Sequence, residues 1–482
     1  MVSFSFDFMG YPLLLGQVDG LSMPFVVAFS VIIVPALWYS FAYHRHRNQS
    51  IVSVLFFLCS LGTVTAGDLL SFLVFWEGMM ILSAILIAVD IGRRDLRIGY
   101  RYLVVHVIAG ASLFLGVIIQ VSSTNSLDLA GLVPAALPFL ILAGVIKAAL
   151  IPFHFWVPDA YGQISPGIAV ILTAFTTKVG VYAIARFFPS LSGLALLGAT
   201  VAVFAVVMAL GQRHLRRVLS YHLIGQIGYM VAGIGALSDI GVAAASLHMF
   251  SGVMYKGLLF MVAGSVLYQM KTDDVGHMGG LIRKMPLTFV AALVGAASIS
   301  GLPPFNGYIS KTALKIALQG DPVISLLLTV AAVLTAMSFA KLLWDIFLRE
   351  KPQCEGGEAR ESPAVLLIPM LVLAGICLGT GIHYPLLTDA LVEISIPPIY
   401  SVGSLWESLY PVLLGVVLVP ITAIKLRHLA RRGLHDLDFV FPRLIEGFTQ
   451  VGRVTRNTLE GHLQTQLLIV TAFLVFLIWM WP

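Results

Sequence analysis

The chain has 482 residues, of which 59% are hydrophobic and only 11% are charged. Soluble domains carry roughly 25% charged residues, so this composition excludes a water-soluble globular enzyme, and the apolar content also excludes a disordered or fibrous chain. The net charge of +5 is attributed to Lys and Arg concentrated in the cytoplasmic loops of a membrane protein rather than to nucleic-acid binding.

The N-terminal segment 1–17 contains no basic residue and no long apolar run, so it is not expected to be a cleavable signal peptide. The three cysteines, Cys59, Cys354 and Cys377, show neither metal-ligand nor disulfide spacing. The chain also lacks a nucleotide-binding loop and a nucleophile constellation. We therefore expect no metal, no cofactor and no catalytic chemistry in this chain.

The apolar runs predict an all-α polytopic membrane protein with about fourteen transmembrane helices, since a spanning helix needs about 20 apolar residues. In chain order the predicted spans are 22–43, 51–66, 69–89, 102–121, 134–152, 166–187, 191–211, 218–237, 240–268, 287–316, 322–347, 363–386, 408–424 and 466–481. Two of them are expected to be broken by proline, at Pro152 and at Pro304. Each break lies next to a deep lysine, which favours inverted repeats around an ion site at mid-membrane.

The basic residues separate by side once these helices are assigned. Of the 29 Lys and Arg residues, 22 fall in segments that this topology places in the cytoplasm. The positive-inside rule then predicts both termini outside the plasma (inner) membrane. The exceptions lie within predicted spans: Lys147, Lys178, Arg186, Lys256, Lys311, Lys315 and Lys341.

The position of each intramembrane basic residue suggests its role. Arg186 and Lys315 lie near outer helix ends, where they can snorkel to the interface. Lys341 can form an ion pair with Asp345 at i,i+4, although a functional role is open. The deeper lysines are more costly, because a charged lysine at mid-membrane costs about 2.5–3.5 kcal/mol. Burial favours a neutral amine and a nearby carboxylate favours the ammonium, so such a lysine can gain and lose a proton.

Glu77 is the candidate carboxylate, since apart from Asp345 it is the only acid well inside a predicted span. Histidine titrates near neutral pH and could bridge proton carriers. The intramembrane histidines are His106, His222 and His248, and His248 is the strongest candidate. A lone histidine in a helix is more often a packing residue with its hydrogen bonds satisfied.

Specific runs point to a known family. They are Val18–Ser22, Phe75-Trp76-Glu77, Ile146–Ala149, Pro152–Ala160, Thr176–Tyr182, Arg217–Tyr221, Gly279–Leu281, Met285-Pro286 and Gly301–Tyr308. Together they resemble the antiporter-like subunits of the proton-pumping arm of respiratory complex I, of Mrp-type multisubunit cation/proton antiporters and of membrane-bound hydrogenases. The resemblance extends to about residue 350, and its most specific part is Pro152-Phe153-His154-Phe155-Trp156-Val157-Pro158-Asp159-Ala160.

The resemblance implies inverted repeats of five helices and a proton relay. Glu77 matches the glutamate that modulates Lys147 on the first broken helix, and Lys178 matches the next relay lysine. Lys311 matches the terminal lysine on the second broken helix, with His248 and Lys256 between. The supporting residues are Pro152, His154, Pro304, Lys341 and Asp345. The implied partners are other membrane subunits, including further antiporter-like subunits, and the lipid bilayer, with no nucleic acid.

The resemblance also divides the chain. The expected segments are N-terminal helices with the glutamate helix (1–101), a first half-channel (102–211), a second half-channel (212–350), peripheral helices (351–424), an amphipathic helix at the cytoplasmic surface (425–465) and an anchor helix (466–482). The amphipathic spacing over 434–463 fits a strut along partner subunits or a plain interfacial anchor. Two departures are notable: Ser251-Gly252 replaces the Asn-His of many relatives, and two helices are missing ahead of residue 19.

These residues predict a proton-translocating antiporter-like subunit, coupled to cation antiport or redox chemistry in partner subunits. An autonomous secondary transporter of a small solute is one alternative, and it would work when expressed alone. A structural subunit with a degenerate relay is the other, suggested by Gly252. Which complex contains the chain, and whether sodium passes through it, stay open at this point.

Overall fold

The computed structural model describes residues 4–8, 10–44, 47–91, 96–188, 191–350, 359–392 and 399–432. All described elements belong to one compact unit that ends at Leu434. In chain order they are β1 (Phe4–Phe8), β2 (Tyr11–Leu15), α1 (Met23–His44), α2 (Arg47–Val64), α3 (Leu69–Ile91), α4 (Leu96–Thr124), α5 (Leu137–Lys147), α6 (Trp156–Tyr161), α7 (Pro166–Phe187), α8 (Leu194–Leu210), α9 (Leu215–Ile234), α10 (Asp239–Met270), the 3₁₀ turns η1 (Val275–His277) and η2 (Leu281–Arg283), α11 (Pro286–Ser300), α12 (Asn306–Leu318), α13 (Pro322–Leu343), the π-helical turn η3 (Trp344–Leu348), α14 (Ala364–Ile382), α15 (Tyr384–Leu391) and α16 (Val402–Arg432).

The fold is mainly helical, and its helices suit a membrane. Within the described ranges, 8 helices are long and apolar enough to cross a bilayer, and four shorter apolar helices accompany them: Asn48–Val64, Leu137–Lys147, Leu194–Leu210 and Pro286–Ser300. The chain is therefore a multi-pass membrane protein. The predicted amphipathic helix over 434–463 and the predicted span 466–481 lie outside the described residues.

Both predicted helix breaks are present. Within the fifth predicted span (134–152), α5 ends at Lys147 and a non-helical segment follows, which leads beyond the span to the short α6. The tenth predicted span is divided into α11 and α12. Proline cannot donate the backbone hydrogen bond that a continuing helix needs, which accounts for the interruptions at Pro152 and at Pro303-Pro304.

The all-α prediction is wrong at the N-terminus, where β1 and β2 form an antiparallel hairpin. The backbone N–H of Leu14 donates to the Asp68 carboxylate at 2.8 Å, and the N–H of Gly67 donates to the Leu14 carbonyl at 2.8 Å. These bonds tie the hairpin to the turn before α3. Such anchoring is not visible in an apolar run, which is why the sequence did not predict the hairpin.

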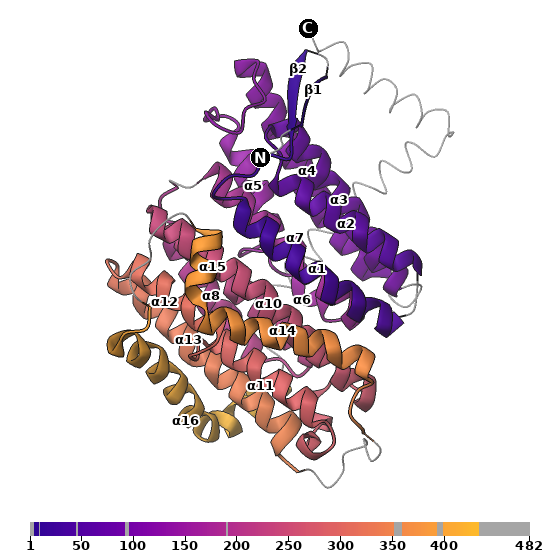
Figure 1. Ribbon diagram of the computed structural model, residues 1–482, viewed down its shortest axis with the longest axis vertical. Coiled ribbons are helices and arrows are strands. Elements are labelled where there is room, and N and C mark those ends of the chain that lie inside the picture. The colour runs from indigo at the N-terminus through magenta and orange to yellow at the C-terminus, as the bar shows by residue number, and fades with distance from the viewer. Residues whose placement is uncertain are drawn as a thin grey trace. The chain divides into compact units, whose positions relative to one another are not determined.

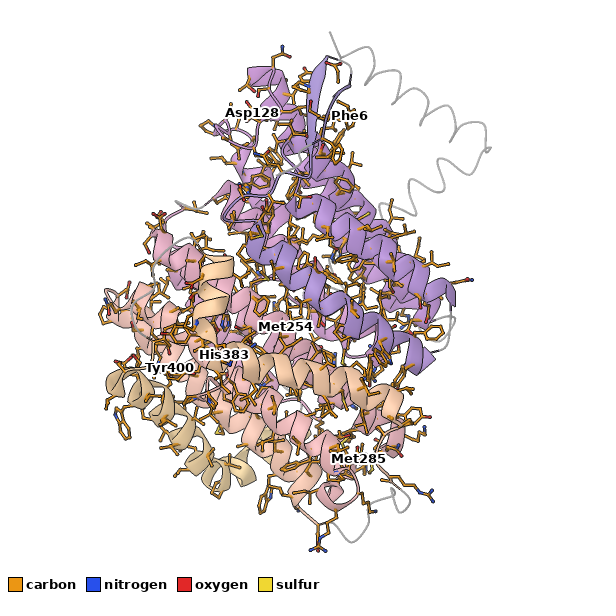
Figure 2. All side chains as sticks on the ribbon, viewed as in Figure 1. Phe6, Asp128, Met254, Met285, His383 and Tyr400 are labelled. Carbon is orange, nitrogen blue, oxygen red and sulfur yellow. The ribbon has the colours of Figure 1, made fainter. Side chains whose placement is uncertain are left out.

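Helices α7 and α10 form the centre of the unit. In Figure 1, α10 lies between the N-terminal helices α1 to α7 and the group of α11 to α14, and α10 packs against α1, α7, α9, α11, α12 and α14. In its most apolar stretch, α7 is 100% buried and α10 is 94% buried, against 22% for α16. Side chains fill the spaces between the helices, with the buried Met254 of α10 near the middle (Figure 2). Polar residues on α7 and α10 are therefore shielded from lipid.

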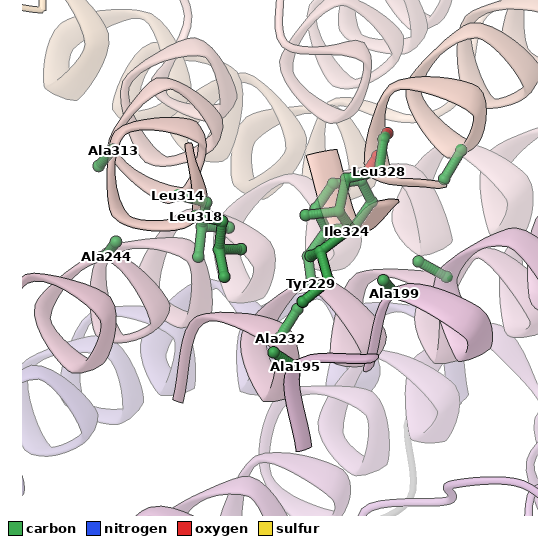
Figure 3. Packing of buried hydrophobic residues seen from close by; sticks show 12 residues of the cluster. Ala195, Ala199, Tyr229, Ala232, Ala244, Ala313, Leu314, Leu318, Ile324 and Leu328 are labelled. Carbon is green, nitrogen blue, oxygen red and sulfur yellow. The ribbon is translucent and has the colours of Figure 1, made fainter. Parts of the chain in front are cut away.

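Small side chains allow α8, α9 and α13 to pack closely. Their shared cluster combines alanines, such as Ala199 and Ala232, with larger residues from α12 and α13, such as Leu318 and Ile324 (Figure 3). Close helix approach through small residues is typical of membrane proteins, where lipid offers no hydrophobic driving force. Tyr229 belongs to this cluster, and its hydroxyl donates to the Leu328 carbonyl at 2.7 Å. Its ring is thereby held in one orientation.

Candidate functional site

The first helix break places Lys147 at a helix end. Lys147 is the last residue of α5, and Ala149 adopts a left-handed backbone with φ of 56°. The Ile146 carbonyl accepts from the indole N–H of Trp156 at 3.1 Å and from the Ala149 backbone N–H at 3.1 Å, which ties the end of α5 to the start of α6. The C-terminal end of a helix carries partial negative charge and stabilises a nearby cation. The break therefore prepares a position for an ammonium group.

Lys147 is held by the residue that precedes Glu77. Its side chain is buried, with 1% exposure, and its Nζ lies 4.1 Å from the centre of the Trp76 ring and 3.5 Å from the Trp76 carbonyl oxygen. A desolvated cation over an indole face is stabilised by about 2 kcal/mol. Glu77 and Lys147 lie within electrostatic range of each other. The Glu77 carboxylate lies against Gly110 of α4.

Lys178 lies on the neighbouring helix α7 and is fully buried. Its Nζ donates to the Thr173 carbonyl at 2.6 Å and to the Thr177 hydroxyl at 3.4 Å. Two residues further along, Gly180 touches the first break, because a Cβ atom there would lie 2.6 Å from the carbonyl carbon of Lys147. The structure thus brings the helices that carry Lys147 and Lys178 into direct backbone contact.

The second break holds Lys311 in a similar way. Helix α11 ends at Gly301 in the left-handed region, with φ of 83°, and α12 begins at Asn306. Lys311 Nζ donates to the Ile299 carbonyl of α11 at 2.7 Å and lies 4.9 Å from the centre of the Tyr229 ring. As at the first break, a buried lysine amine lies beside a helix carbonyl and an aromatic face.

His248 connects three helices. Its Nδ1 lies 2.9 Å from the Ser310 hydroxyl of α12, and its Nε2 lies 3.2 Å from Gln226 Oε1 of α9. The Tyr255 hydroxyl donates to the same Gln226 oxygen at 3.1 Å. A neutral imidazole with its proton on Nε2 satisfies both contacts. Since Ser310 directly precedes Lys311, the Ser310 hydroxyl connects His248 to the segment of α12 that carries this lysine.

Lys256 lies between the other central lysines. It is buried, with 1% exposure, and its Nζ has no hydrogen-bond partner among the residues that the structure describes. Lys178 and Lys311 are both within electrostatic range of it. Lys256 and His248 lie about two turns apart on α10, which places them on the same side of the helix.

The supporting residues are divided between the breaks and the end of α13. Pro152 and Pro304 lie within the two breaks, and the buried His154 has its ring 5.0 Å from that of Phe204. The predicted i,i+4 ion pair is formed, with Lys341 Nζ 3.2 Å from Asp345 Oδ2. No group of three or more His, Cys, Asp or Glu side chains that could hold a metal ion occurs within the described ranges.

Several residues of the site were not predicted from the sequence. Trp76 and Tyr229 each hold a lysine amine, and Gln226 and Ser310 each contact His248. Trp76 was noted only as a neighbour of Glu77 within a family motif. Aromatic residues in a span usually belong to the core, so only the packing of helices distant in sequence reveals these contacts.

Arg186 is held by an ion pair as well as lying near a helix end. It forms a bidentate ion pair with Asp19 just ahead of α1, at 2.6 and 2.8 Å. Burial alone would raise the pKa of Asp19, but hydrogen bonds from Arg186 and Ser22 and the Arg186 charge lower it to about 2. The run Val18–Ser22 therefore ties α1 to the end of α7.

This pair predicts a pH-dependent stability. Because the pKa of Asp19 in the folded state lies below its ordinary value of 3.8, the pair stabilises the fold above about pH 4 and loses that effect as the pH falls toward 2. D19N should lower the thermal unfolding midpoint in detergent at pH 7, and less so at pH 3. D128N, at an exposed side chain, is the control. An equal effect of D19N at both pH values would contradict the assignment.

Sequence comparisons identify a matching family and similar proteins. The family described as "NADH:quinone oxidoreductase/Mrp antiporter, TM" matches residues 66–335. The chain is 32% identical to an NADH-quinone oxidoreductase subunit of Desulforudis audaxviator, over 79% of this chain and 84% of that protein. It is 29% identical to a Na(+)/H(+) antiporter subunit of Alkalihalophilus pseudofirmus, over 74% and 78% of the two chains.

Solved structures share the fold. A chain of the Mrp complex from Dietzia sp. DQ12-45-1b aligns with a TM-score of 0.72 at 23% identity, over 84% of this chain and 86% of that chain. A chain of the membrane-bound sulfane sulfur reductase, an archaeal respiratory membrane complex, aligns with a TM-score of 0.81 at 20% identity, over 99% and 91%.

Proposed function

Since the chain belongs to the NADH:quinone oxidoreductase/Mrp antiporter family, we propose that it translocates protons through a relay of buried lysines as one subunit of a multisubunit membrane complex. The observation that carries the proposal is the burial of Lys256 on α10, a helix that packs against both α7, which carries Lys178, and α12, which carries Lys311. Ionisable residues inside a membrane are costly and typically mark ion pathways. A row of such lysines on packed helices favours ion movement over a structural role.

The names of the relatives support membrane partners. They are subunits of a quinone oxidoreductase and of sodium/proton antiporters, and the similar solved chains come from membrane complexes. We therefore infer partner subunits that include further antiporter-like chains and that supply cation antiport or redox chemistry. The topology that goes with this proposal has about fourteen helices in inverted repeats of five, with both termini outside the plasma membrane.

In the first half-channel, over 102–211, protons from the cytoplasm reach Lys147 and then Lys178. Glu77 modulates Lys147 in this proposal, because a nearby carboxylate favours the ammonium form of a buried amine. The Trp76 ring and carbonyl hold that amine next to the peptide bond that joins Trp76 to Glu77. A small movement of α3 against α5 would then change the charge balance at Lys147.

In the second half-channel, over 212–350, Lys256 and His248 pass protons to Lys311, which releases them outward. The contact of His248 with Ser310 gives a hydrogen-bonded step toward Lys311. Buried polar atoms without a partner in the described part of the chain, such as Asn306 Oδ1 and Thr312 Oγ1, offer sites for water along this step.

Gly252 does not interrupt this path. A Cβ atom at Gly252 would lie 3.1 Å from Met230 Cε and 3.5 Å from the Tyr255 hydroxyl, so these side chains adjoin the place of the missing histidine. The Tyr255 hydroxyl donates to Gln226, which His248 also contacts. Polar groups therefore continue past Gly252, which disfavours a purely structural subunit.

Proton flux in vesicles that contain the assembled complex tests the proposal. K147A and K178A should each lower the flux by about 10²–10⁴-fold, the usual contribution of a positioned proton-transfer group. Native gels should show normal assembly. K271A is the control, since the Lys271 side chain is exposed at the end of α10 and takes no part in the relay. Normal flux in K147A and K178A would refute the relay, and flux through the purified single chain would favour an autonomous transporter.

A further inference from the structure

We propose that a second proton-access route reaches Lys256 from the end of α13, along a line of polar side chains that we name the α13 branch. The branch consists of His222, Ser338, Lys341 and Asp345. It rests on the proposed function, because it delivers protons to a lysine of that relay. The branch differs from the relay in where it opens. It opens beside the second half-channel, at the end of α13 next to Arg349, and the charge distribution assigns this end of α13 to the cytoplasm.

The inner part of the branch is a histidine that the relay does not use. His222 of α9 is fully buried, and its Nε2 lies 2.8 Å from the Ser338 hydroxyl of α13. Its Nδ1 has no hydrogen-bond partner among the described residues, and Lys256 lies within electrostatic range of the ring. An imidazole can take a proton on one nitrogen and release one from the other. His222 can therefore link the Ser338 hydroxyl to the unpartnered amine of Lys256.

The outer part of the branch follows one face of α13. Ser338, Lys341 and Asp345 recur at i, i+3 and i+7, so their side chains share a face. Lys341 Nζ lies 3.2 Å from Asp345 Oδ2, and Arg349 lies 3.6 Å from Asp345 Oδ1. A carboxylate between two cations can release one of them and remain paired with the other, so its negative charge is never left unpaired. This arrangement suits a site where a proton moves past the ion pair.

The branch reaches a cavity. Lys341 and Asp345 line a cavity of about 500 Å³ between α13 and α16, together with Trp344 and Val416. At this point the α-helix changes into the π-helical turn η3, which includes Asp345. Such π-turns inside helices occur frequently at functional sites. The ion pair is thus open on one side, whereas Ser338 and His222 behind it are buried.

A neighbouring threonine supplies a matched control. Thr335 lies one turn before Ser338 and is equally buried, but its hydroxyl donates to the Ala331 carbonyl of its own helix at 2.7 Å. T335V removes a buried hydroxyl from α13 without touching His222. S338A removes the hydroxyl that His222 contacts. Comparing the two variants separates loss of the branch from a general effect on α13.

Two measurements on the full complex test the branch. In the flux assay, adding S338A to K147A should lower the residual proton flux roughly tenfold, as expected when one hydrogen bond to the moving proton is lost, while adding T335V to K147A leaves the residual flux unchanged. In a background without Cys59, Cys354 and Cys377, K341C should react with a small membrane-impermeant methanethiosulfonate reagent from the cytoplasmic side alone.

The outcomes separate the branch from the relay. Residual flux in K147A/S338A equal to that in K147A/T335V, or K341C that is unreactive or reacts from the outer side, would overturn the branch. If K147A still abolishes flux in that case, the proposed relay stands without it. If instead K147A conducts normally, the relay fails, and the labelling of K341C reports water access on its own.

Discussion

Replacing Lys256 by methionine is expected to stop proton flux and at the same time to stabilise the protein. The lysine amine is buried, with 1% exposure, and is unpartnered among the described residues, so it lacks the hydrogen bonds that would offset its removal from water. A buried polar group without a partner costs about 1–3 kcal/mol on protein mutational scales. Methionine has a similar length and volume and carries no such cost.

The flux should fall by about 10²–10⁴-fold in K256M, because the relay loses the group between Lys178 and Lys311. The thermal unfolding midpoint of the purified complex should rise by a few degrees, since a stabilisation of 1 kcal/mol shifts a domain of 150–250 residues by about 2–4 °C. The paired result is informative because functional sites often carry a stability cost.

K271M serves as the control for both measurements, since the Lys271 side chain is exposed at the end of α10, with its amine 4.6 Å from the centre of the Tyr268 ring. It should change neither flux nor midpoint appreciably. A lower unfolding midpoint in K256M would mean that Lys256 has a stabilising partner. The argument that its buried, unpartnered amine lowers the stability of the protein would then fail. Unchanged flux would remove Lys256 from the relay.

The deep lysines were predictable from the sequence because their cost in a membrane makes them conspicuous. Lys147, Lys178, Lys256 and Lys311 stand out in apolar runs, and each proves to be buried in the fold. Their immediate partners were not predictable in the same way. In the sequence, Trp76 looks like any other apolar residue of a span, and only the packing of α3 beside the end of α5 identifies it as a partner of Lys147. The same holds for the partners of the other lysines.

The breaks and the hairpin differ in how strongly the sequence encodes them. Proline within an apolar run predicts an interruption wherever the run lies, so both broken helices were expected. The strands Phe4–Phe8 and Tyr11–Leu15 are each 5 residues long, and short strands carry little periodic signal. His222 is intermediate: its residue type suggested a carrier, but only the contact with Ser338 on a distant helix gives it a route.

A large structural effect is expected from adding a side chain at Gly180. A Cβ atom there would lie 2.6 Å from the carbonyl carbon of Lys147 and 2.8 Å from the Ala148 Cα, and both are backbone atoms at the first break. Backbone cannot move aside as a side chain can, so α7 would have to separate from α5. Overpacking of this kind typically costs about 1–3 kcal/mol and occasionally more.

G180V should therefore prevent assembly or lower the unfolding midpoint strongly, and G180A should assemble but conduct poorly because the lysine at the break is displaced. G99V is the matched control, since a Cβ atom at Gly99 of α4 would meet only the Ile87 side chain, at 4.0 Å. Native gels report assembly and vesicle flux reports conduction. Normal flux in G180A would mean that the exact position of Lys147 against α7 does not matter, and the relay would then need a looser, water-filled connection between its first two lysines.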